Sequence, residues 1–167
     1  MTQQITAKDE SIRKFKELTD DVNICMFTTI DDHNNLFSRP MSTIKIDDEG
    51  NAWFFTNEFS EKIQEVTKDN TVYLIYSHPG KNIYVSVKGT CSVIVNRKKI
   101  DELWNPLLKA WFPQGKEDPR LCLVKVVTEE ASYWNSKAGS MGVYFKMLKA
   151  IANREQYREK DMGKLKL

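Results

Sequence analysis

The chain has 167 residues, of which 41% are hydrophobic and 29% are charged, so it can build a core and is not disordered by composition. Its formal net charge of +2 is too small to indicate binding to nucleic acid or to an anionic membrane. The polar first ten residues lack the apolar stretch of a secretory signal, and no apolar run approaches the roughly 20 residues of a membrane helix. We therefore expect one cytoplasmic domain over residues 1–167.

The first half of the chain predicts a helix followed by three strands. Apolar residues recur at helical spacing over residues 7–22, with charges on the opposite face. Three β-rich runs follow at 24–30, 36–46 and 52–56, separated by the turn-forming sequences DDHNN and DDEGN. Because no helix lies between them, these strands should pair as a meander. The apolar residues of the helix are Ile12, Phe15, Leu18 and Val22.

The second half alternates strands with helices. We expect a short helix over 60–68, a strand over 71–77 and a long strand over 83–95, where Gly89 indicates a bulge or a bend of a barrel. A further helix is predicted over 97–112, because its apolar residues are spaced as one buried stripe. That stripe consists of Ile100, Leu103, Leu107 and Trp111.

Two more strands and a charged tail complete the predicted order. The strands are expected over 121–128 and 131–135, and the pattern over 143–167 is helical, then charged, then alternating in a way that allows a short final strand. Six or seven short strands with peripheral helices favour a mainly β fold, a six-stranded antiparallel barrel with flanking helices. A parallel doubly wound sheet is disfavoured because the first three strands have no helix between them.

The cysteines and histidines argue against a metal centre and a disulfide. Cys25, Cys91 and Cys122 are far apart and lie in apolar runs, which is typical of reduced, buried thiols in a cytosolic protein. The two histidines, His33 and His78, have no nearby cysteine, so we predict no metal site. A cysteine–histidine nucleophilic pair stays open, since such residues can meet in space, but no spacing favours it.

The predicted strand over 36–46 carries an arginine beside a proline. Pro40 has no N–H, so the strand cannot be fully paired there, and the residue before a proline is held extended. Arg39 therefore presents a planar set of donors suited to a phosphate or a carboxylate. Taken alone, the same pattern fits an exposed arginine on an edge strand, which is the commoner setting.

A helix start is predicted shortly after the third strand. Following Thr56 and Asn57, Ser60 stands in a preferred N-cap position and Lys62 in the first helical turn. Unpaired N–H groups and the helix dipole favour an anion at such an end. Lys62 is poorly placed there unless an anion is also bound. The alternative is that Ser60 only caps the helix and that Lys62 is solvated.

Together these two segments resemble the flavin-binding split barrel of the pyridoxamine 5'-phosphate oxidase-like proteins. The pattern Thr56-Asn57-x-x-Ser60-x-Lys62 is similar to that family's phosphate-binding turn, and Arg39 matches the arginine on the preceding strand. The chain length, the Arg-Pro-Met-Ser segment and the Tyr-Trp-Asn segment look closest to the general stress protein branch. The resemblance extends from about residue 7 to residue 135.

This resemblance implies a six-stranded split barrel that forms a homodimer with two flavins at the interface. The flavin would be the mononucleotide (FMN), with the dinucleotide (FAD) as the alternative. The phosphate would be held by Arg39, Ser60 and Lys62, and the backbone from Arg39 to Ser42 would line the isoalloxazine ring. Trp134 would come from the other subunit, although a core or interface aromatic is an equal alternative. The full set of expected flavin contacts is Arg39, Pro40, Met41, Ser42, Phe55, Thr56, Asn57, Ser60, Lys62, Tyr84 and Trp134.

One departure from the family limits the expected activity. True pyridoxine-phosphate oxidases carry an arginine and a histidine close together near the C-terminus, whereas this chain has no histidine after His78. We therefore do not expect oxidation of vitamin B6 phosphates. The flavin site itself is largely untouched by this difference.

Several functions remain as hypotheses at this stage. The first is a flavin-dependent oxidoreductase with a stress-related role, and the second is a flavin-binding or flavin-buffering protein without catalysis. A haem-handling barrel ranks lower, because the two histidines that could act as axial ligands are predicted in turns. An oligonucleotide-binding barrel also ranks lower, because the chain has no stripe of lysine and arginine.

Overall fold

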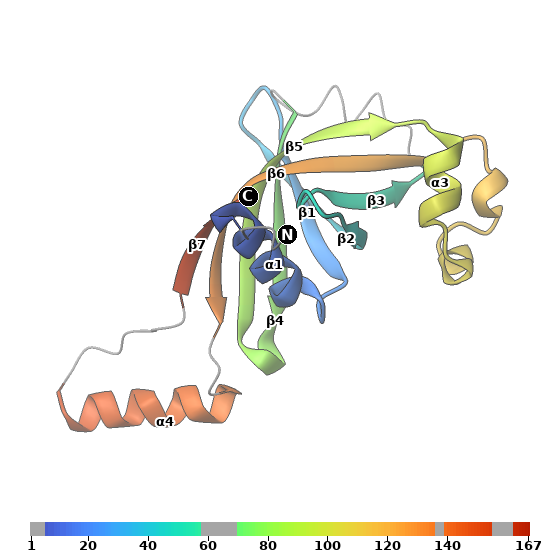
Figure 1. The fold of residues 1–167 in the computed structure, drawn as a ribbon. Helices are drawn as coiled ribbons and strands as arrows, with labels where there is room; N and C mark the ends of the chain where they lie inside the picture. The colour runs from blue at the N-terminus through green and yellow to red at the C-terminus, as the bar shows by residue number, and fades with distance from the viewer. Residues whose placement is uncertain (1–5, 58–69, 136–138, 155–161) are drawn as a thin grey trace, which may run out of the picture.

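The computed structural model describes residues 6–57, 70–135, 139–154 and 162–167, and its centre is an antiparallel barrel (Figure 1). Seven strands pair in the order β3-β2-β1-β4-β5-β6-β7, and an additional pairing of β3 with β6 closes the first six into the barrel. The predicted antiparallel barrel and meander are therefore confirmed. The strands are β1 (Ile24–Ile30), β2 (Leu36–Ile46), β3 (Ala52–Thr56), β4 (Thr71–His78), β5 (Ile83–Ile94), β6 (Cys122–Asn135) and β7 (Met162–Lys166).

Strand β6 changes its second partner half-way along. β5 pairs with β6 along nearly its whole length, whereas β3 pairs only with the first part of β6 and β7 only with the last part. The barrel is thus closed at one end of β6 and extended by an extra edge strand at the other. The predicted short strand in the GKLKL tail is confirmed as β7.

A bulge keeps β6 continuous where two separate strands were predicted. The register between β5 and β6 shifts at Gly89, so that β6 holds one more residue than β5 across this point. The acidic pair Glu129 and Glu130, which suggested a break, lies at this bulge inside one strand. The predicted bulge at Gly89 is confirmed, and a β-carbon there would lie 2.6 Å from the carbonyl oxygen of Val127.

The N-terminal helix α1 (Ala7–Thr19) packs against the barrel through its predicted apolar face. Thr6 and Asp9 form a capping box at its start, which satisfies two backbone donors of the first turn. Phe15 and Leu18 are fully buried in the barrel core. The helix ends at Thr19, three residues before the predicted end, and Val22 is buried just beyond it.

The helix predicted over 97–112 is wrong in its second half. Helix α3 ends at Leu103, and a 3-10 helix, η3 (Pro106–Ala110), follows after an extended Asn105. The reason is Pro106, because a residue before proline avoids the helical conformation, and the Asn105 side chain caps the new start. Helix α3 spans Arg97–Leu103, and a second short 3-10 helix, η4, spans Gly115–Glu117.

This break changes which residues of the predicted stripe are buried. Leu108 is buried, whereas Leu107 is 80% exposed and Trp111 is 69% exposed. The two buried members, Ile100 and Leu103, belong to a second apolar cluster that also contains Trp53, Phe55, Leu121 and Leu123.

Helix α4 (Gly139–Ala152) connects β6 to β7 and confirms the predicted helical tail. Among the helices of the described residues, none is long and apolar enough to span a membrane. A 3-10 turn, η2 (Pro79–Lys81), occupies the predicted turn between β4 and β5. The helix predicted over 60–68 lies outside the described residues.

Gly89→Ala should destabilise the fold by about 1–3 kcal/mol, because the added methyl group would overlap the backbone of β6 and force a shift. Gly80→Ala is the matched control, since its β-carbon would meet nothing closer than 3.4 Å. Urea unfolding of both variants measures the difference. Equal midpoints for the two variants would show that the close approach at Gly89 has no energetic effect.

Candidate functional site

Among the described residues, no strand pairs with one edge of β2 over its first part. β3 pairs with β2 only from Thr43 onward, whereas β1 pairs with β2 from Leu36 to Ser42. The Thr43 N–H donates to the Asn23 carbonyl at 2.7 Å. In an antiparallel pair such bonded positions alternate, so Met41 and Arg39, the second and fourth residues before Thr43, exchange hydrogen bonds with β1. The residues between them, which include Pro40 and Ser42, direct their backbone groups away from β1. Proline is therefore tolerated here, because the missing N–H is not needed by the β1 ladder.

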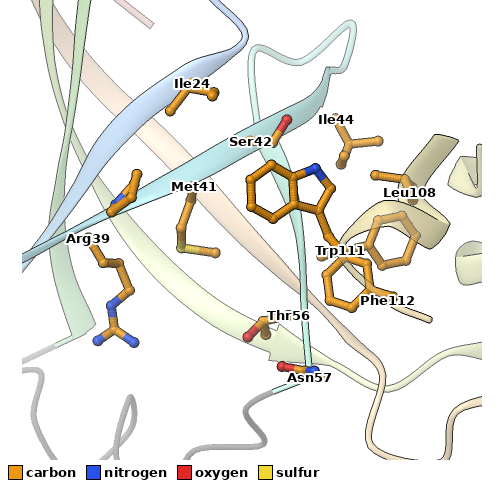
Figure 2. A pocket seen from close by; sticks show the side chains of 12 residues that line it. Ile24, Arg39, Met41, Ser42, Ile44, Thr56, Asn57, Leu108, Trp111 and Phe112 are labelled. Carbon is orange, nitrogen blue, oxygen red and sulfur yellow. The ribbon is translucent and has the colours of Figure 1, made fainter. Parts of the chain in front are cut away.

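A cavity of about 390 Å³ lies against this free edge (Figure 2). Residues of both strand faces line it, so it extends around the edge of β2 rather than covering one face. It is also bounded by the end of β3 and by the segment around η3. The lining residues are Ile24, Arg39, Pro40, Met41, Ser42, Ile44, Phe55, Thr56, Asn57, Leu108, Trp111 and Phe112.

The two ends of the cavity differ in chemistry. The guanidinium of Arg39 lies at one end, and the rings of Trp111 and Phe112 lie at the other, with Met41 between them. Among the described lining residues, Arg39 is the only one with an ionisable side chain. Such a cavity can hold an elongated molecule that is anionic at one end and apolar and flat over the rest.

Seven of the eleven residues expected at a flavin line this cavity, namely Arg39, Pro40, Met41, Ser42, Phe55, Thr56 and Asn57. They come from β2 and from the end of β3, which the fold brings together. Ser60 and Lys62 lie outside the described residues. Tyr84 and Trp134 do not line the cavity in this chain, and they pair with one another across β5 and β6.

Sequence reasoning missed the apolar end of the cavity. Ile44 lies on β2 itself, two residues beyond Ser42, and Ile24 lies on β1 directly opposite Ser42. Leu108, Trp111 and Phe112 come from a region that was predicted as a continuous helix with Trp111 in a buried stripe. The Asn-Pro pair at 105–106 was the signal that could have revealed the exposed turn.

The cavity opens onto an apolar patch on the outer surface of the barrel. Ile24 lines the cavity, and Met26, two residues along β1, lies on the same face and pairs with Ile75 of β4. Tyr84 and Trp134 continue this face across β5 and β6. All five side chains are between 38% and 52% exposed. Several exposed apolar side chains on one face are typical of an interface.

The cysteine thiols are not candidates for nucleophilic chemistry at this site. Cys25 and Cys91 are buried, and burial raises the pKa of both thiols, that of Cys25 to about 12. Cys122 has its sulfur 3.5 Å from the carbonyl oxygen of Thr56, which lines the cavity, and burial raises its pKa as well. These thiols are therefore protonated near neutral pH. No group of three or more potential metal ligands occurs within the described parts of the chain.

Comparison with known proteins identifies the family. The model of the family described as pyridoxamine 5'-phosphate oxidase like matches residues 10–158. The chain belongs to this family. The family predicted from the Arg39 and Thr56–Lys62 segments is therefore confirmed.

This pyridoxamine 5'-phosphate oxidase-like chain is also similar to individual proteins of known sequence or structure. Protein bli-3 of Neurospora crassa is 28% identical over 144 residues, which cover 80% of this chain and 69% of that protein. The crystal structure of the general stress FMN/FAD binding protein of Xanthomonas citri is 28% identical with a TM-score of 0.63, and covers 75% of this chain and 89% of its own. A structure of general stress protein 26 from Jannaschia sp. CCS1 has a TM-score of 0.69, covers 96% of this chain and 99% of its own, and at 22% identity shows the fold alone.

The raised pKa of Cys25 predicts a loss of stability at alkaline pH. Below about pH 8.5 the thiol is protonated in both states and contributes nothing, but above it the unfolded chain releases the proton while the folded chain keeps it until about pH 12. The free energy of unfolding should therefore fall by about 1.4 kcal/mol per pH unit for this one group.

Urea unfolding of the reduced protein between pH 8.5 and 10 measures this slope. Cys25→Ser should make the slope shallower by about that amount, because the hydroxyl does not titrate in this range, while the other cysteines still contribute. An unchanged slope in the variant would mean that the Cys25 thiol ionises as easily in the folded protein as in the unfolded chain.

Proposed function

We propose that this protein binds FMN in the cavity beside β2 and acts as a flavin-dependent oxidoreductase. The observation that carries the proposal is the placement of Arg39 at one end of a cavity beside β2 whose other described lining side chains are uncharged. The FMN/FAD binding description of the Xanthomonas citri relative supports the choice of ligand. FAD is the alternative flavin.

The described residues fit a flavin mononucleotide in size and chemistry. The cavity volume of about 390 Å³ falls within the usual range for small-ligand sites, roughly 300–1,000 Å³. The flat apolar rings of the ligand would lie against Met41 and Phe55, and the polar edge of the ring would meet backbone groups that β2 directs away from β1. The phosphate would lie at the Arg39 end.

The phosphate would be neutralised by two cations and one hydroxyl. Arg39 presents its planar guanidinium from β2, and in this proposal Ser60 and Lys62 follow in the chain just beyond Asn57, which lines the cavity. Charge-assisted hydrogen bonds to a phosphate belong to the strong class. These phosphate contacts are therefore expected to favour the phosphorylated flavin over riboflavin.

The protein's part in the chemistry is to position and to shield the ligand. Flavin supplies hydride and electron transfer when it is bound. The backbone of β2 from Arg39 to Ser42 would orient the ring edge, because a strand held by β1 on one side cannot move freely. Preorganised backbone donors at that edge would stabilise negative charge on a reduced ring. The described residues of the cavity supply no carboxylate, histidine or thiolate, so hydrolysis by acid–base catalysis is not supported.

A flavin-storage protein is the second candidate, because it would need the same site without a reactant. Turnover of reduced nicotinamide with an added electron acceptor separates the two. Steady turnover by the FMN-loaded protein supports the oxidoreductase, whereas stoichiometric binding without turnover of any acceptor supports storage.

We also propose that the active form is a homodimer. The apolar outer face is continuous with the cavity, so a second copy seated on that face would close the flavin site and could contribute its own Trp134. The position of Trp134 on this face, rather than in the cavity of its own chain, supports a contribution across the dimer.

Light scattering of the FMN-loaded protein should give about twice the chain mass of 19.4 kDa. Ile75→Glu should shift the mass toward a monomer, because it places a charge on the apolar face, where Ile75 is 44% exposed. Val127→Glu is the matched control, since Val127 is equally exposed at 46% but pairs with Thr90, six residues along β5 from Tyr84. A monomeric wild type at micromolar concentration would overturn the proposed dimer.

Arg39→Ala should weaken FMN binding by about ten- to a hundredfold, because one charge-assisted hydrogen bond contributes roughly 1.5–3 kcal/mol and 1.4 kcal/mol is a factor of ten. Lys62→Ala should have a similar effect, and Ser60→Ala a smaller one. Lys45→Ala is the matched control, since it removes a positive charge from the same strand at a residue that does not line the cavity. Flavin fluorescence titration measures each dissociation constant.

Riboflavin separates loss of the phosphate contact from a general loss of structure. It should bind wild type weakly, and its affinity should hardly change in Arg39→Ala, provided that the variant melts at the wild-type temperature without ligand. If Arg39→Ala and Lys62→Ala fold normally and bind FMN as tightly as wild type, the assigned site is wrong.

A further inference from the structure

The apolar end of the cavity contains a large aromatic side chain that the fold does not bury. Trp111 lines the cavity and is nevertheless 69% exposed. It stands at the end of η3, where the break before Pro106 turns the chain outward. In Figure 2 its ring is drawn between Met41 and Phe112, away from Arg39. A ring in this position is available to a molecule that enters the cavity from solvent.

The wall behind Trp111 is held rigidly by aromatic packing. The ring of Phe55 packs edge-on against two other rings. Its centroid lies 6.1 Å from that of Phe112 and 5.7 Å from that of Trp104. Leu108, which also lines the cavity, is buried in the same apolar cluster. The apolar end is therefore preorganised, and its lining does not have to collapse or reorder to receive a ring.

Charge selects the kind of molecule that this end can accept. The described side chains there are Ile44, Leu108, Trp111 and Phe112, and none of them is ionisable. A phosphate or carboxylate would lose its hydration at this end without gaining a charged partner. A flat, uncharged molecule loses little hydration free energy and gains contact with the indole ring.

We propose that the Trp111 end of the cavity binds an uncharged, planar aromatic reactant beside the flavin, with quinones as the representative class. This inference rests on the proposed function, because it places the reactant next to the bound ring. It assigns Trp111 to reactant binding, whereas Arg39 binds the flavin phosphate. It also predicts that a reactant whose phosphate or carboxylate would have to enter this end is a poor ligand.

Isothermal titration of the FMN-loaded protein with 2,3-dimethyl-1,4-naphthoquinone tests the proposal. Trp111→Ala should weaken quinone binding by about tenfold or more, because it removes an aromatic contact and its buried apolar area. Leu107→Ala is the matched control, since Leu107 is an exposed apolar residue of the same 3-10 helix that does not line the cavity. It should leave quinone binding within about twofold of wild type, and a sulfonated naphthoquinone should bind wild type at least about tenfold more weakly than the neutral compound.

The affinity for FMN, measured on the same variants, distinguishes failure of this proposal from failure of the proposed function. FMN affinity that changes by less than about threefold in Trp111→Ala, together with lost quinone binding, supports a separate reactant subsite. If Trp111→Ala weakens FMN as much as quinone, the aromatic end belongs to the flavin and the proposal is overturned while the flavin function stands. Absence of quinone binding to FMN-loaded wild type also overturns it. A wild type that binds no flavin would overturn the proposed function and, with it, this inference.

Discussion

The candidate site depends on one pairing that is missing among the described strands. β1 pairs with β2 from Leu36 to Ser42, whereas β3 joins the other edge of β2 only from Thr43 onward. Pro40 lies within the unpaired part, at a position whose backbone faces away from β1, so a strand extended alongside would find no N–H donor there. The sheet is thereby kept open at this point, and the space that a longer β3 would have filled becomes the cavity.

The cavity lies where two apolar cores meet. Met41 packs against the large core inside the barrel, whereas Ile44 and Phe112 pack against the smaller cluster built around Phe55 and α3. Each wall is therefore fixed by a different set of buried contacts. Arg39 stands on the side of the barrel core and Trp111 on the side of the smaller cluster, which explains why the two ends differ so strongly in chemistry.

The strands and the polar end of the site could be predicted from the sequence because their signals are local. Turn residues delimit β1, β2 and β3 sharply, and Arg39 and Thr56 gain their meaning from a short motif within those strands. The apolar end could not be predicted in the same way. Helical spacing continued through Pro106, and it favoured a buried Trp111, whereas the proline broke the helix and Leu108 was buried instead. The continuity of β6 was missed for a related reason, since a bulge can place two charged residues inside a strand.

The closure of the barrel by β3 and β6 also bears on how the chain acquires its shape. Ala52 pairs with Val126, so this contact joins segments that are far apart in sequence, whereas β1 and β2 are neighbours connected by a tight turn. Distant pairings carry a large entropic cost of loop closure and form slowly. The hairpin of β1 and β2 can therefore precede the β3–β6 seam in time. Since the end of β3 is one wall of the cavity, a ligand site would be completed only when β3 pairs with β6. A bound ligand would therefore chiefly slow the loss of this pairing rather than speed its formation.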